Sequence, residues 1–144
     1  MLVTFCGHSQ VSDHAGVSAA LRRVIAELIA EGADEFYLGG YGEFDSLAAA
    51  AVRDAKKTNP GICSTLVIPY LDRDYDPAYY DGSVYPPLET VPRRYAISHR
   101  NKWMVEQADV IVAHVTHDWG GAATTLKYAN RKNKKIISIS STSL

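Results

Sequence analysis

The residues of this chain that are suited to chemistry gather in three glycine-containing segments, each of which follows a short apolar run. These segments are Gly7 to Ser9, Gly39 to Asp45 and Gly120 to Thr125. Glycine lets the backbone approach a ligand closely, and free N–H groups at the start of a helix attract anions. The pattern is typical of a phosphate site, although Gly-Gly before a helix is also an ordinary way to turn the chain.

Three further side chains are candidates for ligand binding or catalysis. Arg100 suits bidentate contact with a phosphate, and the alternative is a surface salt bridge. Asp45 is placed either to bind a ribose hydroxyl or to cap the helix that follows it. Glu43 offers a carboxylate for glycosidic chemistry, or is a solvated loop residue.

The histidines and cysteines do not indicate a metal centre. His8, His114 and His117 lack a recognisable zinc spacing, so no metal ligand is predicted. Cys6 and Cys63 lie within or beside predicted strands, and both are interpreted as buried free thiols.

Five apolar runs alternate with four stretches of helical spacing, which predicts one α/β domain over residues 1–144 with a mainly parallel five-stranded sheet and helices on both faces. The predicted strands are 2–6, 35–38, 64–70, 109–114 and 136–139. The predicted helices begin after Ser12 or Asp13, at Asp45, at Arg93 and at Gly121. Such sheets bind ligands beyond the carboxyl ends of their strands, where the strand order reverses. We expect the first and fourth strands to be neighbours at that point.

Two common nucleotide motifs are missing from the sequence. No G-x-G-x-x-G follows the first strand, which disfavours an ordinary dinucleotide dehydrogenase. The sequence also lacks G-x-x-x-x-G-K-[ST], the phosphate loop of many NTPases. A nucleotide site here would therefore use different loops.

Residues 71–92 interrupt the alternation with four tyrosines and four prolines. Loops of this length in a compact domain are usually functional or disordered, and the tyrosines disfavour disorder. One interpretation is a cover over one end of the sheet or over a subunit contact. The other is a lid whose rings stack on a base.

Composition excludes several classes of partner. The chain is 47% apolar and 22% charged, with a net charge of −1, so it lacks the basic footprint of a protein that binds nucleic acid polymers. No apolar run has the length of a membrane span. The first residues lack the features of a signal peptide, and a cytoplasmic protein is expected.

Five segments, taken in order, carry a resemblance to a known family: Phe5 to His8, Gly39 to Val52, Arg100 to Val105, Ala108 with Asp109, and Gly120 to Ala129. They resemble the SLOG superfamily of Rossmann-like, doubly wound domains, and within it the small YpsA-like (DUF1273-type) proteins. The resemblance implies a nucleotide-derived ligand, such as an ADP-ribose derivative, held at the glycine-rich loops. The ligand-binding residues that it implies are Gly7, His8, Ser9, Gly39, Gly40, Asp45, Arg100, Asn101, Gly120, Gly121, Thr124 and Thr125.

The sequence departs from the enzymes of this superfamily at one decisive position. The LOG enzymes hydrolyse nucleoside monophosphates to free base and ribose phosphate, and they use an arginine and the glutamate of a PGGxGTxxE motif. Arg100 matches the arginine, but Lys127 stands where the glutamate would be. A lysine cannot stabilise an oxocarbenium-like centre as a carboxylate does. YpsA-like proteins also usually have an arginine at the position of Ser9. One cation for the phosphate is therefore missing, or it is supplied by Arg93 or Arg94.

Residues and resemblance together predict a binding module that senses or sequesters a nucleotide-derived small molecule and needs no cofactor. The alternative is an N-glycoside hydrolase, or a nucleoside or nucleotide transferase, that uses Glu43 or Asp45 with Arg100. A homodimer or higher homo-oligomer is expected, because exposed aromatics around Trp103 and the tyrosine-rich segment call for a partner surface.

Overall fold

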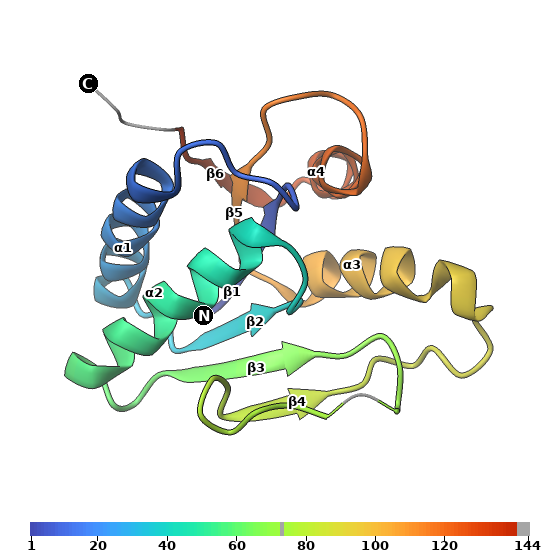
Figure 1. Ribbon diagram of the computed structural model, residues 1–144, viewed down its shortest axis with the longest axis horizontal. Coiled ribbons are helices and arrows are strands. Elements are labelled where there is room, and N and C mark those ends of the chain that lie inside the picture. The colour runs from blue at the N-terminus through green and yellow to red at the C-terminus, as the bar shows by residue number, and fades with distance from the viewer. Residues whose placement is uncertain (73, 141–144) are drawn as a thin grey trace.

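The structure is a computed structural model that describes residues 1–72 and 74–140 (Figure 1). It is a single parallel sheet flanked by helices, which confirms the predicted fold class. Its strands are β1 (Leu2–Gly7), β2 (Glu35–Leu38), β3 (Cys63–Val67), β4 (Gly82–Val84), β5 (Val110–His114) and β6 (Lys135–Ser138). Its helices are α1 (His14–Ala30), α2 (Glu43–Thr58), α3 (Ala96–Gln107) and α4 (Gly121–Arg131), with a 3-10 turn, η1 (Arg93–Tyr95), before α3.

The strand order β4-β3-β2-β1-β5-β6 places β1 in the middle of the sheet. From β1 the chain proceeds through β2, β3 and β4 on one side, and then crosses back to β5 and β6 on the other. β1 pairs with β5 from Val3 and Val110 to Gly7 and His114. The expectation that the first and fourth predicted strands are neighbours is therefore confirmed, and the strand order reverses between them.

The sheet has six strands rather than the predicted five. The extra strand, β4, lies within the tyrosine-rich segment and pairs with β3 through Gly82, Ser83 and Val84. Three residues with one apolar side chain carry no alternation that sequence patterning can detect. Pairing with β3 at the sheet edge, rather than local propensity, makes this segment a strand.

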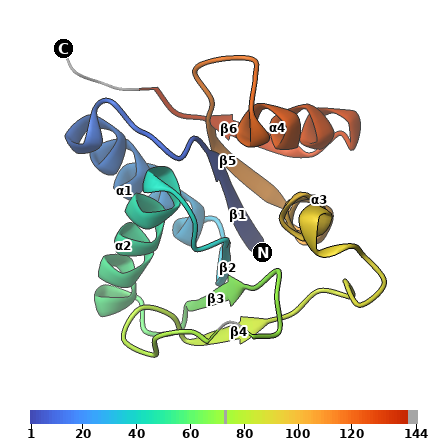
Figure 2. The same ribbon diagram turned by 45° about the vertical axis from the view of Figure 1, so that its right-hand side comes forward.

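Helices cover both faces of the sheet, with α1 and α2 on one face and α3 and α4 on the other (Figure 2). Side chains of β1 alternate between the two layers. Val3 and Phe5 join the core under α1 and α2, whereas Leu2 and Cys6 join the core under α3 and α4. Both faces of β1 are buried, and its side chains are apolar apart from Thr4, as is usual for a central parallel strand.

Helix α1 starts where the capping signal predicted. Oδ1 of Asp13 accepts the N–H of Gly16 at 3.0 Å, so Asp13 rather than Ser12 is the N-cap. The apolar face of the helix, which includes Leu21 and Ile25, is fully buried. Helical spacing of the apolar residues therefore predicted this element and its orientation.

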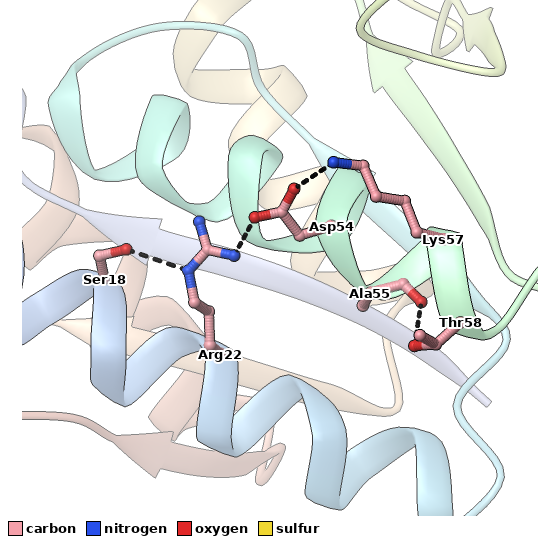
Figure 3. Close-up of polar contacts among 6 residues, drawn as sticks. All are labelled: Ser18, Arg22, Asp54, Ala55, Lys57 and Thr58. Carbon is pink, nitrogen blue, oxygen red and sulfur yellow. Dashed lines mark hydrogen bonds and ion pairs between the residues drawn. The ribbon is translucent and has the colours of Figure 1, made fainter.

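A small polar network links the exposed sides of α1 and α2 (Figure 3). Arg22 forms an ion pair with Asp54 and donates to Oγ of Ser18 at 3.3 Å. Lys57 approaches the same aspartate at 3.2 Å. Exposed pairs of this kind contribute little stability, so the buried core between the helices and the sheet holds the layer together. Within the described residues, no helix has both the length and the apolar character needed to cross a membrane.

Candidate functional site

The loops that leave β1, β2 and β5 converge on one cleft of about 710 Å³ at the carboxyl ends of these strands. The reversal of strand order between β1 and β5 brings them together, because neighbouring parallel strands end at the same edge of the sheet. Ten of the residues implied by the resemblance line this cleft: Gly7, His8, Ser9, Gly39, Asp45, Arg100, Asn101, Gly120, Gly121 and Thr125.

Three candidates lie outside the lining of the cleft, namely Gly40, Thr124 and Glu43. Oε1 of Glu43 accepts the N–H of Val11 at 2.6 Å and approaches Nε2 of His14 at 3.1 Å. The Val11 N–H, and after it His14, lower the pKa of this carboxyl. Glu43 thus ties the start of α2 to the loop that follows β1.

Asp45 is buried and holds the loop that leaves β2. Its carboxylate accepts the N–H of Gly39 at 3.0 Å and the N–H of Gly40. Burial raises the pKa of Asp45, while these two hydrogen bonds and the charge of Arg100 oppose that shift. Asp45 is not the N-cap of α2, because Gly42 occupies that position with a φ of 92°. Its carboxylate instead fixes the backbone that forms one wall of the cleft.

Arg100 is 3% exposed, so it is not a surface residue. Its Nη1 donates to the carbonyl oxygens of Gly39 and Val67, both at 2.8 Å, and its Nε donates to Oδ1 of Asn101 at 2.9 Å. These carbonyls end β2 and β3, so the guanidinium joins two strand ends under the cleft. A surface salt bridge is thereby excluded.

The amino end of α4 forms the opposite part of the cleft. Gly120 is the N-cap at a φ of 92°, which favours glycine, and no side chain caps this helix end. A Cβ at Gly121 would meet no atom within 4 Å apart from its chain neighbours and the backbone of its own helix. The first N–H groups of an α-helix have no acceptor within the helix, so those at Gly121 and Ala122 are suited to an anion. The hydroxyl of Thr125 donates to the carbonyl of Gly121 at 2.9 Å.

Three rings stack beside this helix end, an arrangement that the sequence analysis missed. The rings of His8 and His117 lie 3.7 Å apart between centroids, and those of His117 and Trp119 lie 3.9 Å apart, with 17° between the planes in each pair. Nε2 of His8 accepts the N–H of Thr116 at 2.9 Å. The only signal in the sequence was a tryptophan directly before Gly120, because the stack joins residues more than one hundred positions apart.

The hydrogen bond from Thr116 to His8 leads to a prediction about how the stability of the protein depends on pH. Burial, and then the neighbouring His117 and His114, lower the pKa of His8 below its usual 6.5. A His with a lowered folded pKa stabilises the fold above its unfolded pKa, and this stability is lost as the pH falls through the folded pKa. We expect wild type to lose more stability between about pH 7 and about pH 5 than His8→Gln, whose amide oxygen can accept the same N–H without titrating. Urea unfolding at each pH measures this difference, and parallel curves for the two proteins would contradict it.

His114 lies deeper, with Nδ1 at 2.9 Å from the carbonyl oxygen of Ile139 and its ring stacked on Phe44. Phe44 also fills the space above Gly7, where a Cβ would overlap the phenyl ring. Within the described residues, no group of three His, Cys, Asp or Glu side chains is arranged to hold a metal ion.

The two cysteines differ, contrary to the interpretation of both as buried. Cys6 is buried under the cleft and its thiol donates to the carbonyl of Ala122 at 3.2 Å. Cys63 is exposed because it begins β3, where the strand emerges from the core.

This difference predicts selective alkylation. Burial raises the pKa of Cys6 to about 12, so at pH 8 only about one thiol in ten thousand is ionised there. A thiol reagent is expected to modify about one cysteine per native chain and both cysteines after denaturation. Cys63→Ser should remove the rapid native reaction. Equal rates for the two thiols would contradict the burial of Cys6.

The tyrosine-rich segment does not form a lid over this cleft. None of Tyr75, Tyr79, Tyr80 and Tyr85 lines the cleft. The guanidinium of Arg53 lies 4.7 Å above the centre of the Tyr79 ring, and Tyr80 packs against the core beneath α2. Pairing of β4 with β3 carries this segment to the edge of the sheet, so the interpretation as a base-stacking lid is wrong.

No protein-family model and no curated protein sequence matches the chain. Solved structures do match its fold. TM1055, a structural-genomics target, is 20% identical with a TM-score of 0.65 over 94% of this chain and 71% of its own. DNA processing protein A from Helicobacter pylori, described for its single-stranded DNA binding mode, is 16% identical with a TM-score of 0.69 over 96% of this chain and 64% of its own. The Moco carrier protein from Chlamydomonas reinhardtii is 15% identical with a TM-score of 0.60 over 96% of this chain and 75% of its own.

At these identities the similarity concerns the fold alone. The chain shares a Rossmann-like arrangement with proteins of quite different description. A fold of this kind supports many unrelated functions, so the function of this chain has to be argued from the site itself.

Proposed function

We propose that the cleft binds a phosphorylated, nucleotide-derived small molecule, and that the chain is a YpsA-like member of the SLOG superfamily. One observation carries the proposal: loops from three adjacent strands meet at the reversal of strand order, beside an uncapped helix end with open space above Gly121. Helix starts of this kind favour phosphate through their N–H groups and dipole.

The proposed pose follows from the walls of the cleft. The phosphate lies over Gly121 and accepts N–H groups from the first turn of α4. The sugar faces the Gly39 loop, whose backbone is held by Asp45 on one side and by Arg100 on the other. The volume of about 710 Å³ is within the usual range for small-molecule sites.

Binding without turnover is favoured over the alternative of glycoside hydrolysis. Among the described residues that line the cleft, Asp45 is the only carboxylate, and both of its oxygens accept backbone N–H groups. Glu43 does not line the cleft, and its carboxylate accepts the N–H of Val11. Nζ of Lys127, which stands in the place of the catalytic glutamate of LOG enzymes, donates to the carbonyl of Asp118 at 3.2 Å. The side chains that the alternative needs are thus committed elsewhere.

Self-association remains part of the proposal, with a revised surface. Trp103 is partly buried, and its ring stacks on Tyr37 with 5.8 Å between centroids. It is therefore less available than expected, whereas Tyr95, directly before α3, is exposed. Light scattering of the whole chain at high concentration tests this, and a monomer would contradict it.

A panel of ligands tests the proposed function. The protein is heated with AMP, ADP, ADP-ribose, ribose 5-phosphate or inorganic phosphate, and the same samples are analysed for released base. A ligand present at one hundred times its Kd stabilises the fold by about 2.7 kcal/mol, which raises Tm measurably. We expect at least one organic phosphate to raise Tm and to be recovered intact. Release of free base would favour the hydrolase, and no shift with any compound at millimolar concentration would overturn the proposal.

A further inference from the structure

The ring stack beside α4 ends in a bare aromatic face. His117 lies between His8 and Trp119, so one face of the indole is covered by an imidazole at 3.9 Å. Trp119 nevertheless remains 69% exposed. Since its inner face is covered, this exposure belongs to the outer face and the ring edges. Trp119 also lines the cleft.

The stack is held in place before any ligand arrives. His8 follows β1 directly, and its Nε2 binds the N–H of Thr116 on the loop that carries His117 and Trp119. Nζ of Lys127 donates to the carbonyl of Asp118 in the same loop at 3.2 Å. Two residues outside the loop therefore hold it in place. A ligand ring that stacked on Trp119 would not have to spend binding free energy on ordering this loop.

A second exposed ring lies on the opposite rim of the cleft. Tyr41 is 73% exposed and lines the same cleft from the loop after β2. Because β2 and β5 flank β1 on its two sides, Tyr41 and Trp119 approach the cleft from opposite directions. Large exposed aromatics are costly in water, and a pair on the two rims of one cleft suits a flat apolar ring.

We propose that the outer face of Trp119 is the subsite for the base of the ligand, with Tyr41 as a further aromatic ring of the same cleft. The ligand class is then a phosphate ester that carries a planar heteroaromatic ring of purine size, rather than a plain sugar phosphate. This inference rests on the proposed function and makes it more specific. The base is thus assigned to Trp119 and not to the tyrosine-rich segment. It lies further out than His8, because His117 already covers one face of the His8 ring.

The chain offers a direct optical test, because it has two tryptophans. In a Trp103→Phe background, Trp119 is the only indole, and its fluorescence reports on its own surroundings. AMP is expected to quench this emission in a saturable way, whereas ribose 5-phosphate at saturation leaves it nearly unchanged. Calorimetry on the same samples gives the two affinities.

The decisive quantity is the ratio of the affinities for AMP and ribose 5-phosphate. Base stacking on an aromatic side chain contributes about tenfold to hundredfold in affinity. Trp119→Ala is expected to lower the ratio by that factor, Trp119→Phe to retain most of it, and Tyr41→Ala to lower it by less. Tyr79→Ala is the matched control, since Tyr79 is 50% exposed but does not line the cleft.

The outcomes separate the two proposals. If ribose 5-phosphate binds as tightly as AMP, or if Trp119→Ala weakens both ligands equally, the base subsite is overturned while the phosphate site stands. If neither compound binds, the base subsite is overturned, whereas the proposed function fails only if no compound of the panel raises Tm. If Trp119→Ala abolishes self-association and leaves the ratio of the two affinities unchanged, the base subsite is overturned and the ring faces a protein partner instead.

Discussion

Gly121→Val is expected to lower the affinity for AMP by at least a hundredfold while the protein keeps its fold. Gly121 opens α4, and a Cβ built there meets no atom within 4 Å apart from its chain neighbours and the backbone of its own helix, so the side chain would project into open space at the cleft. The branched side chain of the valine would occupy the space through which the phosphate has to approach the first N–H groups of the helix. Losing several charge-assisted hydrogen bonds at about 1.5–3 kcal/mol each corresponds to two decades or more.

The folded state should tolerate this change. Gly121 is not among the glycines with positive φ, unlike its neighbour Gly120 at 92°. Valine is also a better helix former than glycine, so stability should stay within about 0.5 kcal/mol of wild type or rise slightly. Gly61→Val is the matched control, because Gly61 has an equally open surrounding and does not line the cleft. We expect Gly61→Val to bind as wild type does.

Calorimetry with AMP and urea unfolding of both variants test this expectation. Equal affinity of wild type and Gly121→Val for AMP would move the phosphate away from α4. If both glycine variants lost affinity for AMP, the loss would reflect a general effect of valine on the protein. That result would contradict a phosphate site located at the start of α4.

The parts of this fold that the sequence predicted are those governed by local patterns. Apolar spacing located α1, the capping aspartate Asp13 set its start, and the Gly120-Gly121 pair marked the start of α4. The neighbouring positions of β1 and β5 followed from their continuous apolar runs, since only central parallel strands are buried on both faces. These features depend on side-chain type and spacing within a few residues.

The parts that it did not predict depend on contacts between distant segments. Whether Arg100 reaches an anion or a carbonyl is decided by Gly39 and Val67, which lie 61 and 33 positions away. The stack of His8 on His117 joins β1 to the loop after β5. Sequence spacing assigns residues to an edge of the sheet, but the direction of each side chain there depends on tertiary packing.

Arg100→Ala illustrates the consequence, because we expect it to destabilise the fold rather than to leave it intact. The guanidinium is 3% exposed and donates to two carbonyl oxygens at strand ends. Removing a buried charge with its hydrogen bonds leaves these acceptors unpaired and leaves the buried Asp45 carboxylate without its neighbouring cation. The expected loss in the free energy of unfolding is about 3–5 kcal/mol.

Urea unfolding of Arg100→Ala, Arg100→Lys and Arg93→Ala measures this loss. Lysine cannot reproduce the planar fork that serves Gly39, Val67 and Asn101 together, so Arg100→Lys should recover only part of the stability. Arg93 is the matched control: its side chain is 69% exposed, and it stacks on Tyr70 at the surface. Its removal should change stability by less than about 1 kcal/mol. An Arg100→Ala protein as stable as wild type that no longer binds AMP would assign Arg100 to the ligand instead, and the strand-end role described above would be wrong.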